Sequence, residues 1–309
     1  MNILLITTGG TIASVIGDGY IGVTSTGRLL VLEKYREIDK SVSFEVLSPI
    51  NILSENIGVS DYKAIIDTFM NIDMKPYDGI IVTHGSDTLS YTSAMLGLLF
   101  SDIEKPIALV AADKPLQDEK SNGMDNFIAA VEIIRKGMNS VFVPYRNCDG
   151  VVYIHKATQI LESSEFSDDF YSVKKPYAVF KNGEITLSDT SCEKDLTLKL
   201  KDADLSFRKK VMQIHPYPDI DYDRFDINSV KAVIHRSYHA GSVCCTDDSK
   251  SSVLSLIKRC KKANVPFYIC GMKSKETDYQ SLTLAKENGA KIMYDVSPAC
   301  LYMKLMLEG

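Results

Sequence analysis

Short, largely apolar runs alternate with amphipathic segments along the first half of the chain. Residues 3–6 (ILLI) and 79–83 (GIIVT) are continuous runs of this kind, which are typical of strands buried on both faces of a sheet. Residues 124–136 instead place apolar side chains every three to four positions and end in Arg-Lys, which predicts a helix. This alternation predicts βαβ units, and therefore a parallel sheet covered by helices on both faces.

Each of the two predicted strands ends in a turn that contains glycine. Residues 7–10 (TTGG) follow the first strand, and His84 and Gly85 follow the second. Right-handed crossovers place the carboxyl ends of parallel strands at one edge of the sheet, and ligands bind at that edge. We therefore expect a functional site to lie at these two turns.

The α/β pattern stops in a polar, charged segment at residues 187–209, which we interpret as a linker. A second series of short apolar runs and helical patterns follows over residues 210–309. The sequence thus predicts an α/β protein of two domains. A flavodoxin-like, parallel-sheet N-terminal domain at residues 1–186 would carry the catalytic site, and a smaller α/β C-terminal domain would occupy residues 210–309.

The amino-acid composition argues against several classes of protein. The chain has 309 residues, 35 of them basic and 40 acidic, so its formal net charge is −5. This acidic balance argues against a nucleic-acid partner, which usually requires a basic stripe. The seven cysteines are scattered and odd in number, as in a reducing compartment rather than a disulfide framework. Neither a signal peptide nor an apolar stretch near ~18 residues is visible, so we expect a cytoplasmic protein without a membrane partner.

Hydroxyl side chains surround the first turn. In residues 7–14 (TTGGTIAS), two glycines let the backbone turn sharply and approach a ligand closely, and threonine or serine flanks them on both sides. The segment is neither the G-x-G-x-x-G dinucleotide fingerprint nor a Walker motif, because no lysine follows. A hydroxyl-capped turn from a strand into a helix would explain the same residues without any site.

The second turn combines a carboxylate with hydroxyls. Ser86, Asp87 and Thr88 stand together where a strand becomes a helix, although each could simply cap that helix. Because both turns point to one crevice, we favour a shared site over two separate caps. A hydroxyl nucleophile needs a base or a positive neighbour, and a lysine of lowered pKa steered by a carboxylate can serve. Two hydroxyls that face one carbonyl suit acyl transfer.

These residues carry a family resemblance. TTGGTIAS at residues 7–14, together with THGSDTL at residues 83–89, resembles the two signature blocks of the bacterial-type L-asparaginase family. Further matches follow in the family's order at residues 19–21 and 53–56, and weaker ones at residues 111–126, 148–156, 236–238 and 295–297. The cytoplasmic, type I branch is the more similar one, because no signal peptide is visible and residues 236–238 read Arg-Ser-Tyr.

The resemblance implies a set of catalytic residues. Thr11 would be the nucleophile that attacks the side-chain amide of the substrate, and Tyr20 would lie over it and assist proton transfer. Ser86, Asp87 and Lys156 would form a second hydroxyl–carboxylate–lysine set near the same carbonyl. Backbone amides of the two turns would help to hold the oxyanion. The sequence leaves open whether Thr11 or Ser86 attacks first.

The resemblance also implies the substrate and its contacts. Ser54 and Glu55 would bind the α-carboxylate and α-ammonium groups of an amino acid, Asp87 could also hold the ammonium group, and Ser86 and Ala112 would complete the pocket. The implied reaction converts L-asparagine to L-aspartate and ammonia through a threonine-linked acyl-enzyme. It implies no metal ion and no organic cofactor, and the family implies a homodimer or homotetramer.

Two features depart from the family pattern. The second block usually has threonine where this chain has Ser86, which keeps the hydroxyl but loses the methyl group that stiffens χ1. We expect catalysis to survive this change with a looser rotamer. The spacing between Gly150 and Lys156 holds one extra residue, so His155 is an adjacent alternative for the place of the lysine.

Three other functions stay open. Glutamine is one methylene longer than asparagine, and one methylene discriminates by only ~1–3 kcal/mol, so a glutaminase-asparaginase of relaxed specificity is one. A tRNA-dependent amidotransferase component shares these motifs, but the acidic balance and the lack of an added N-terminal domain count against it. A non-catalytic amino-acid sensor could keep Ser54, Glu55 and Asp87 for binding, but the retained catalytic set argues against it.

Overall fold

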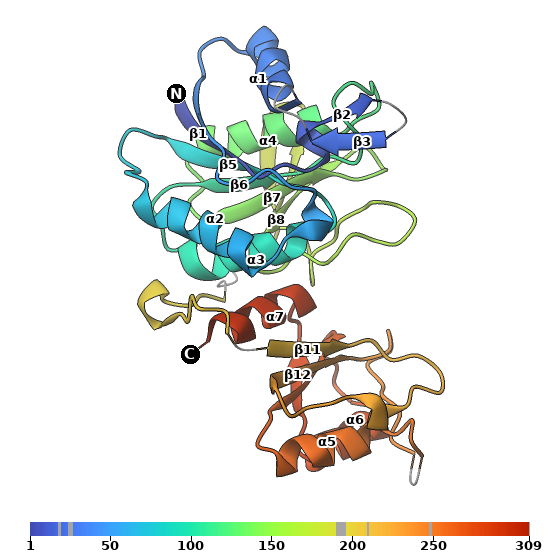
Figure 1. The fold of residues 1–309 in the computed structure, drawn as a ribbon. Coiled ribbons are helices and arrows are strands. Elements are labelled where there is room, and N and C mark those ends of the chain that lie inside the picture. Colours follow the sequence, from blue (N-terminus) through green and yellow to red (C-terminus); the bar gives the residue numbers. More distant parts are fainter. Residues whose placement is uncertain (18–19, 24–26, 190–195, 209, 247–248, 309) are drawn as a thin grey trace. The chain divides into compact units, whose positions relative to one another are not determined.

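The computed structural model describes residues 1–17, 20–23, 27–189, 196–208, 210–246 and 249–308. The chain divides into two compact units, Met1–Lys201 and Asp202–Gly309 (Figure 1). The division falls inside the segment that the sequence predicts as a linker, of which residues 190–195 and 209 lie outside the described residues. In the described parts of the chain, no helix is both long enough and apolar enough to span a lipid bilayer.

One mixed sheet forms the centre of the first unit. Eight strands of its described residues join in the order β10-β9-β8-β7-β6-β5-β1-β4. The parallel strands are β1 (Asn2–Thr7), β4 (Ser43–Leu47), β5 (Gly79–Thr83), β6 (Ile107–Val110) and β7 (Val141–Arg146). Three antiparallel strands extend one edge: β8 (Val152–Lys156), β9 (Ala178–Lys181) and β10 (Glu184–Leu187). The parallel order β4-β1-β5-β6-β7 is the flavodoxin-like order, so the predicted α/β fold is confirmed.

Helices cover both faces of this sheet. Two helices, α1 (Gly27–Ile38) and α4 (Gly123–Arg135), lie on one face, and α2 (Val59–Asn71) and α3 (Leu89–Phe100) lie on the other (Figure 1). Every residue of β5 and β6 is buried as a result. The double covering explains why these strands are continuously apolar instead of alternating between apolar and polar residues.

The strand order reverses between β1 and β5. The chain leaves β1 toward β4 on one side, and the next parallel strand, β5, lies on the other side. Thr7 pairs in register with Thr83, so β1 and β5 end at the same level. In open α/β sheets, the crevice outside such a reversal is where ligands bind. The fold therefore sets the two glycine-containing turns side by side at a position suited to a ligand.

Short elements surround this reversal. The 3-10 turn η1 (Thr11–Ala13) follows the first glycine-containing turn directly. After it, β2 (Ser14–Gly17) and β3 (Tyr20–Val23) pair as antiparallel strands. A second 3-10 turn, η2 (Ser54–Asn56), lies in the connection between β4 and α2. Three predicted site residues, Thr11, Tyr20 and Ser54, thus begin short elements near the crevice.

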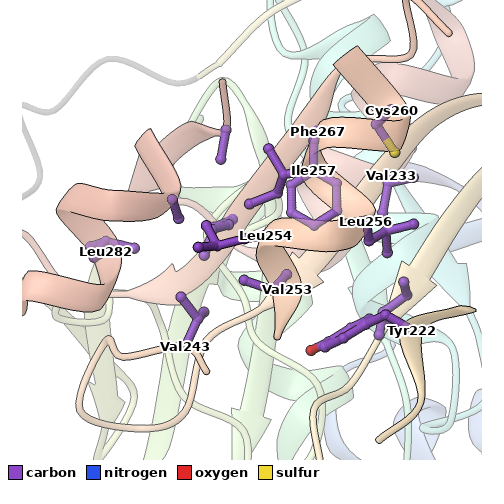
Figure 2. Packing of buried hydrophobic residues seen from close by; sticks show 14 of the residues in the cluster. Tyr222, Val233, Val243, Val253, Leu254, Leu256, Ile257, Cys260, Phe267 and Leu282 are labelled. Atoms are coloured by element: carbon purple, nitrogen blue, oxygen red, sulfur yellow. The ribbon is translucent and has the colours of Figure 1, made fainter. Parts of the chain in front are cut away.

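The second unit is a smaller α/β domain, as predicted. Its described residues contain a parallel sheet of the strands β11 (Lys210–Ile214), β12 (Val230–Arg236), β13 (Phe267–Met272) and β14 (Lys291–Tyr294), in that order. Its helices are α5 (Val253–Lys262), α6 (Gln280–Glu287) and α7 (Pro298–Leu307). Figure 2 shows Leu256 and Ile257 of α5 packing with Phe267 and Val233 of the sheet. The apolar face of α5 thereby closes one side of the sheet.

Candidate active site

Two glycines let the first turn pack directly against its neighbours. Gly9 and Gly10 have positive φ angles of 112° and 78°, which side chains strongly disfavour. A Cβ atom on Gly9 would lie 2.1 Å from the carbonyl oxygen of Ile52, and one on Gly10 would lie 2.3 Å from the amide nitrogen of Gly85. Gly10 N–H donates to Ile52 O at 3.1 Å. Glycine is therefore required at both positions, because the backbone of this turn packs directly against the backbone of Ile52 on one side and of Gly85 on the other.

The second turn is anchored by backbone hydrogen bonds on both sides. The amide and the hydroxyl of Thr8 both donate to Thr83 O, at 3.2 and 2.8 Å. On the other side, His84 N–H donates to Val110 O at 2.8 Å. A Cβ atom on Gly85 would lie 2.4 Å from the hydroxyl oxygen of Ser54. The connection after β4 thus closes on both turns, and all three segments are in contact.

A hydroxyl and a carboxylate meet where these segments touch. Ser54 is buried, and its hydroxyl donates to Oδ2 of Asp87 at 3.1 Å. The hydroxyl of Thr88 in turn donates to Ser54 O at 2.9 Å. Asp87 itself is exposed, so its carboxylate faces solvent while one oxygen accepts the serine hydroxyl. This arrangement holds the side chain of Asp87 beside the two turns.

The structure brings most of the other predicted residues to the same edge. Thr11 follows Gly10 directly and is partly exposed, Ser86 is partly exposed in the second turn, and Glu55 is exposed on η2. Ala112 is buried just after β6, the neighbour of β5. The side chain of Tyr20 lies outside the described part of the chain. Among the described residues, no three or more His, Cys, Asp or Glu side chains are grouped so that they could hold a metal ion.

A comparison with known protein families identifies the family to which these two turns belong. The family model described as "Asparaginase, N-terminal" matches residues 2–191, which is more than half of the chain. The chain belongs to the asparaginase family. Its two matched turns are therefore the turns of an asparaginase-family amidohydrolase, and the expected family is confirmed.

The relatives of this asparaginase-family chain include proteins of two kinds. It is 26% identical over 324 residues to a glutamyl-tRNA(Gln) amidotransferase subunit of Methanosphaera stadtmanae, an alignment that covers 99% of this chain and 71% of that protein. It is 31% identical over 150 residues to an L-asparaginase of Thermococcus kodakarensis, but this covers only 47% of this chain and 44% of the relative. The solved structure of the thermostable L-asparaginase from Thermococcus kodakarensis superimposes with a TM-score of 0.78 at 21% identity, covering 99% of this chain and 92% of that one. This last likeness shows the shared fold.

The structure does not bring Lys156 to the two turns of this asparaginase-family chain. Lys156 is the last residue of β8 and pairs with Phe142, near the amino-terminal start of β7. Because β8 runs antiparallel to β7, its end lies toward the opposite edge of the sheet from Ser86 and Asp87. There the lysine is buried, with Nζ 5.3 Å from the ring centroid of Tyr177. The expected hydroxyl–carboxylate–lysine set is therefore not assembled from these residues.

The alternative residue, His155, lies in the same strand and does not reach the turns either. It pairs with Val143 of β7, and its Nδ1 lies 2.9 Å from the hydroxyl oxygen of Ser172. The imidazole is buried, and burial lowers its pKa to about 3. His155 is therefore a neutral side chain of the domain core, and its Nε2 has no hydrogen-bond partner within the described residues.

His84 is a residue of the site to which sequence reasoning assigned no role. Its Nδ1 lies 2.8 Å from Gly85 O, and its Nε2 lies 2.8 Å from the hydroxyl of Thr92 in α3. Because a carbonyl oxygen can only accept, Nδ1 carries the proton and Nε2 accepts from Thr92. Burial lowers the pKa of His84 to about 4, so the ring is neutral. It holds the second turn to the first turns of α3. A histidine beside the turn was the visible signal, but its partners are not readable from sequence.

Two asparagine side chains fix the turn after β6. Asn126 donates through Nδ2 to Ala111 O at 2.9 Å and accepts the amide of Arg146 at 2.6 Å. Asn122 accepts the amide of Asp113 at 2.9 Å, and the Asp113 carboxylate accepts the amide of Asn122 at the same distance. These bonds tie the turn that carries Ala112 to the ends of β7 and α4. They are positioning contacts that hold the wall of the crevice.

Proposed function

We propose that the chain hydrolyses L-asparagine to L-aspartate and ammonia. The observation that carries this proposal is the direct contact between the Gly9–Gly10 turn, Ser54 and the Gly85–Asp87 turn at the reversal of the strand order. The contact sets side by side the segments that carry Thr11, Ser54 and Asp87. These are the groups that an amide of an amino acid needs for binding and for acyl transfer.

The charges of the crevice support an amino-acid substrate. Asp87 and Glu55 are exposed carboxylates, and either can face an α-ammonium group. Ser54 supplies a hydroxyl beside Asp87 for the α-carboxylate end of the substrate. Ala112, just after β6, is fully buried in the apolar core, so its side chain is not exposed to a substrate. The remaining, side-chain amide of the substrate would then be directed toward Thr11.

The proposed reaction has two steps that balance. In the first, Oγ1 of Thr11 attacks the side-chain carbonyl carbon, the C–N bond breaks, and the hydroxyl proton passes to the leaving nitrogen, which departs as ammonia. In the second, water attacks the threonine ester, L-aspartate leaves, and a proton returns to the threonine oxygen. Backbone N–H groups of the turns would stabilise the oxyanion in both steps. Tyr20 is the group that we propose carries these protons.

Ammonia release tests the proposal. The wild type, Thr11→Ala and Thr11→Ser are assayed with L-asparagine and, in parallel, with L-glutamine. We expect release by the wild type, none by Thr11→Ala and partial release by Thr11→Ser, because serine retains the hydroxyl. Release by Thr11→Ala at the wild-type rate would contradict the role of Thr11. The glutamine arm ranks the two substrates and thereby tests relaxed specificity.

The alignment over 99% of the chain favours a second candidate, a component of an amidotransferase that works on a tRNA-bound amino acid. In this case the chain would release ammonia from the same crevice, and a partner protein would consume it. A folded chain that releases no ammonia alone but is retained on immobilised tRNA would favour this candidate. A chain that releases ammonia alone and ignores tRNA would favour the free hydrolase, which we propose works as a homodimer or homotetramer in the cytoplasm.

A further inference from the structure

The connection that follows β8 returns along α3 to the second turn. At the end of β8, Thr158 packs so closely against the later half of α3 that a Cβ atom on Gly97 would lie 2.9 Å from its methyl carbon. Four residues further on, Glu162 meets the first turn of the same helix, where the phenol of Tyr91 donates to its Oε1 at 2.6 Å. The six helical residues between Tyr91 and Gly97 span about 9 Å along the axis. The connection therefore brings a carboxylate back to the end of α3 that carries the second turn.

Residues 161–171 of this connection form an arm of two antiparallel segments. The amide of Leu161 donates to Tyr171 O at 2.8 Å, which joins the two segments. The returning segment is fixed to the end of β7 by a reciprocal pair of hydrogen bonds. Asn147 donates through Nδ2 to Phe170 O at 2.9 Å, and the amide of Phe170 donates to Asn147 Oδ1 at 3.0 Å. The arm thus stands at the ligand-binding edge, tied to β7 on one side and to α3 on the other.

A continuous series of hydrogen bonds links Glu162 to the crevice. The amide of Tyr91, whose phenol binds Glu162, donates to Thr88 O at 3.1 Å. The hydroxyl of Thr88 donates to Ser54 O, and the hydroxyl of Ser54 donates to the carboxylate of Asp87. The first bond of the series is partly buried and has a charged acceptor, and such bonds are stronger than bonds between neutral groups. A movement of the start of α3 would therefore displace the groups that we propose bind the substrate.

We propose that Glu162 is a positioning residue for substrate binding. Through Tyr91 it holds the start of α3, and with it the carboxylate of Asp87 that receives the α-ammonium group of the substrate. This inference rests on the proposed function, because the role of Asp87 belongs to that proposal. In this role Glu162 supplies a hydrogen-bond acceptor to the phenol and no charge to the substrate. A neutral acceptor of the same length can therefore replace it, whereas a side chain without an acceptor cannot.

Steady-state ammonia release from L-asparagine, measured well below the melting temperature of each variant, tests the pair. We expect Glu162→Ala and Tyr91→Phe each to raise KM about tenfold, as for one lost hydrogen bond to a charged group, with a smaller change in kcat. Glu162→Gln should keep the KM of the wild type, because its amide oxygen accepts the same phenol. The double variant Glu162→Ala/Tyr91→Phe should be no worse than the weaker single variant, because both changes break one bond.

Two results would overturn the inference. A pair that only stabilises the fold would lower the melting temperature of Glu162→Ala and Tyr91→Phe and leave KM unchanged. A KM of Glu162→Gln as high as that of Glu162→Ala would show that the charge of Glu162, rather than its bond to Tyr91, acts on the substrate. Tyr153→Phe is the matched control, because it also removes a tyrosine–carboxylate bond of the first unit, that from Tyr153 to Asp149 at 2.8 Å, and it should keep the KM of the wild type.

Calorimetric titration with L-aspartate separates this inference from the proposed hydrolysis. If the wild type binds L-aspartate but releases no ammonia, the hydrolysis is wrong, and the Kd for L-aspartate should still rise about tenfold in Glu162→Ala and stay unchanged in Glu162→Gln. An active wild type whose KM and Kd are both shared by Glu162→Ala would overturn the positioning role alone. A folded wild type that neither releases ammonia nor binds L-aspartate would overturn the proposed function and this inference with it.

Discussion

Protonation of His84 should weaken the fold of the first unit in mild acid. The ring is 1% exposed, and both of its nitrogens are hydrogen-bonded in the neutral form. Burial lowers its pKa from 6.5 to about 4. Between these two values the unfolded chain binds a proton that the native chain does not bind. The free energy of unfolding therefore falls as the pH falls from about 6.5 toward 4.

The size of this effect follows from the two pKa values. The whole interval corresponds to about 3 kcal/mol of unfolding free energy, of which about 2 kcal/mol is already lost at pH 5. His84→Gln keeps one donor and one acceptor but does not titrate. Urea unfolding at pH 7.5 and pH 5.0 should therefore show that the wild type loses about 2 kcal/mol more than the variant between these pH values.

Two comparisons make this measurement specific. His155 and His235 are also buried with pKa values lowered to about 3 and about 4, but both are present in wild type and variant, so their effects cancel. His239 is an exposed histidine, and His239→Gln should keep the pH dependence of the wild type. If His84→Gln loses as much unfolding free energy as the wild type between pH 7.5 and 5.0, then protonation of His84 does not cause the pH dependence, and the reasoning is wrong.

Four further substitutions test the crevice and its surroundings. Gly10→Ala should abolish ammonia release and lower the unfolding free energy by more than ~1–2 kcal/mol, because its Cβ would meet Gly85 N and its φ is positive; full activity would contradict the contact. Asn126→Ala should cost ~1–3 kcal/mol in urea unfolding through the loss of its bonds to Ala111 and Arg146. Asp87→Asn should raise KM for L-asparagine about tenfold or more with the loss of a charged contact, and an unchanged KM would remove Asp87 from the substrate site. Lys156→Met should leave kcat within about twofold of the wild type, whereas a large loss of kcat would show that Lys156 takes part in the reaction.

The crevice was predictable from sequence because it depends on local signals and one topological rule. Each glycine-containing turn follows a continuous apolar run, and parallel strands bring such turns to one edge. The register of Thr7 with Thr83 makes the turns meet at the same level. Ser54 enters by resemblance alone, because no local pattern says that the connection after β4 closes on both turns. Its contact with Gly85 depends on tertiary packing over a long sequence separation.

Lys156 was misplaced because its position depends on strand direction and register rather than on motif. The matched segment continues into β8, which returns antiparallel along β7 and carries the lysine away from the turns. A one-residue change of register would also move its side chain to the other face of the sheet. Neither the direction of β8 nor its register is encoded in the spacing from Gly150.

The position of Lys156 changes how the proton transfers of the proposed reaction are shared. At the second turn, Oδ2 of Asp87 accepts the hydroxyl of Ser54 at 3.1 Å. We propose that this carboxylate holds the α-ammonium group of the substrate and does not shuttle protons for Thr11. His84, the histidine of the second turn, is buried and uses both nitrogens to hold that turn. We therefore propose that Tyr20, which begins β3, relays the protons of this reaction. In this proposal the second turn binds and orients the amide, and Thr11 and Tyr20 perform the chemistry.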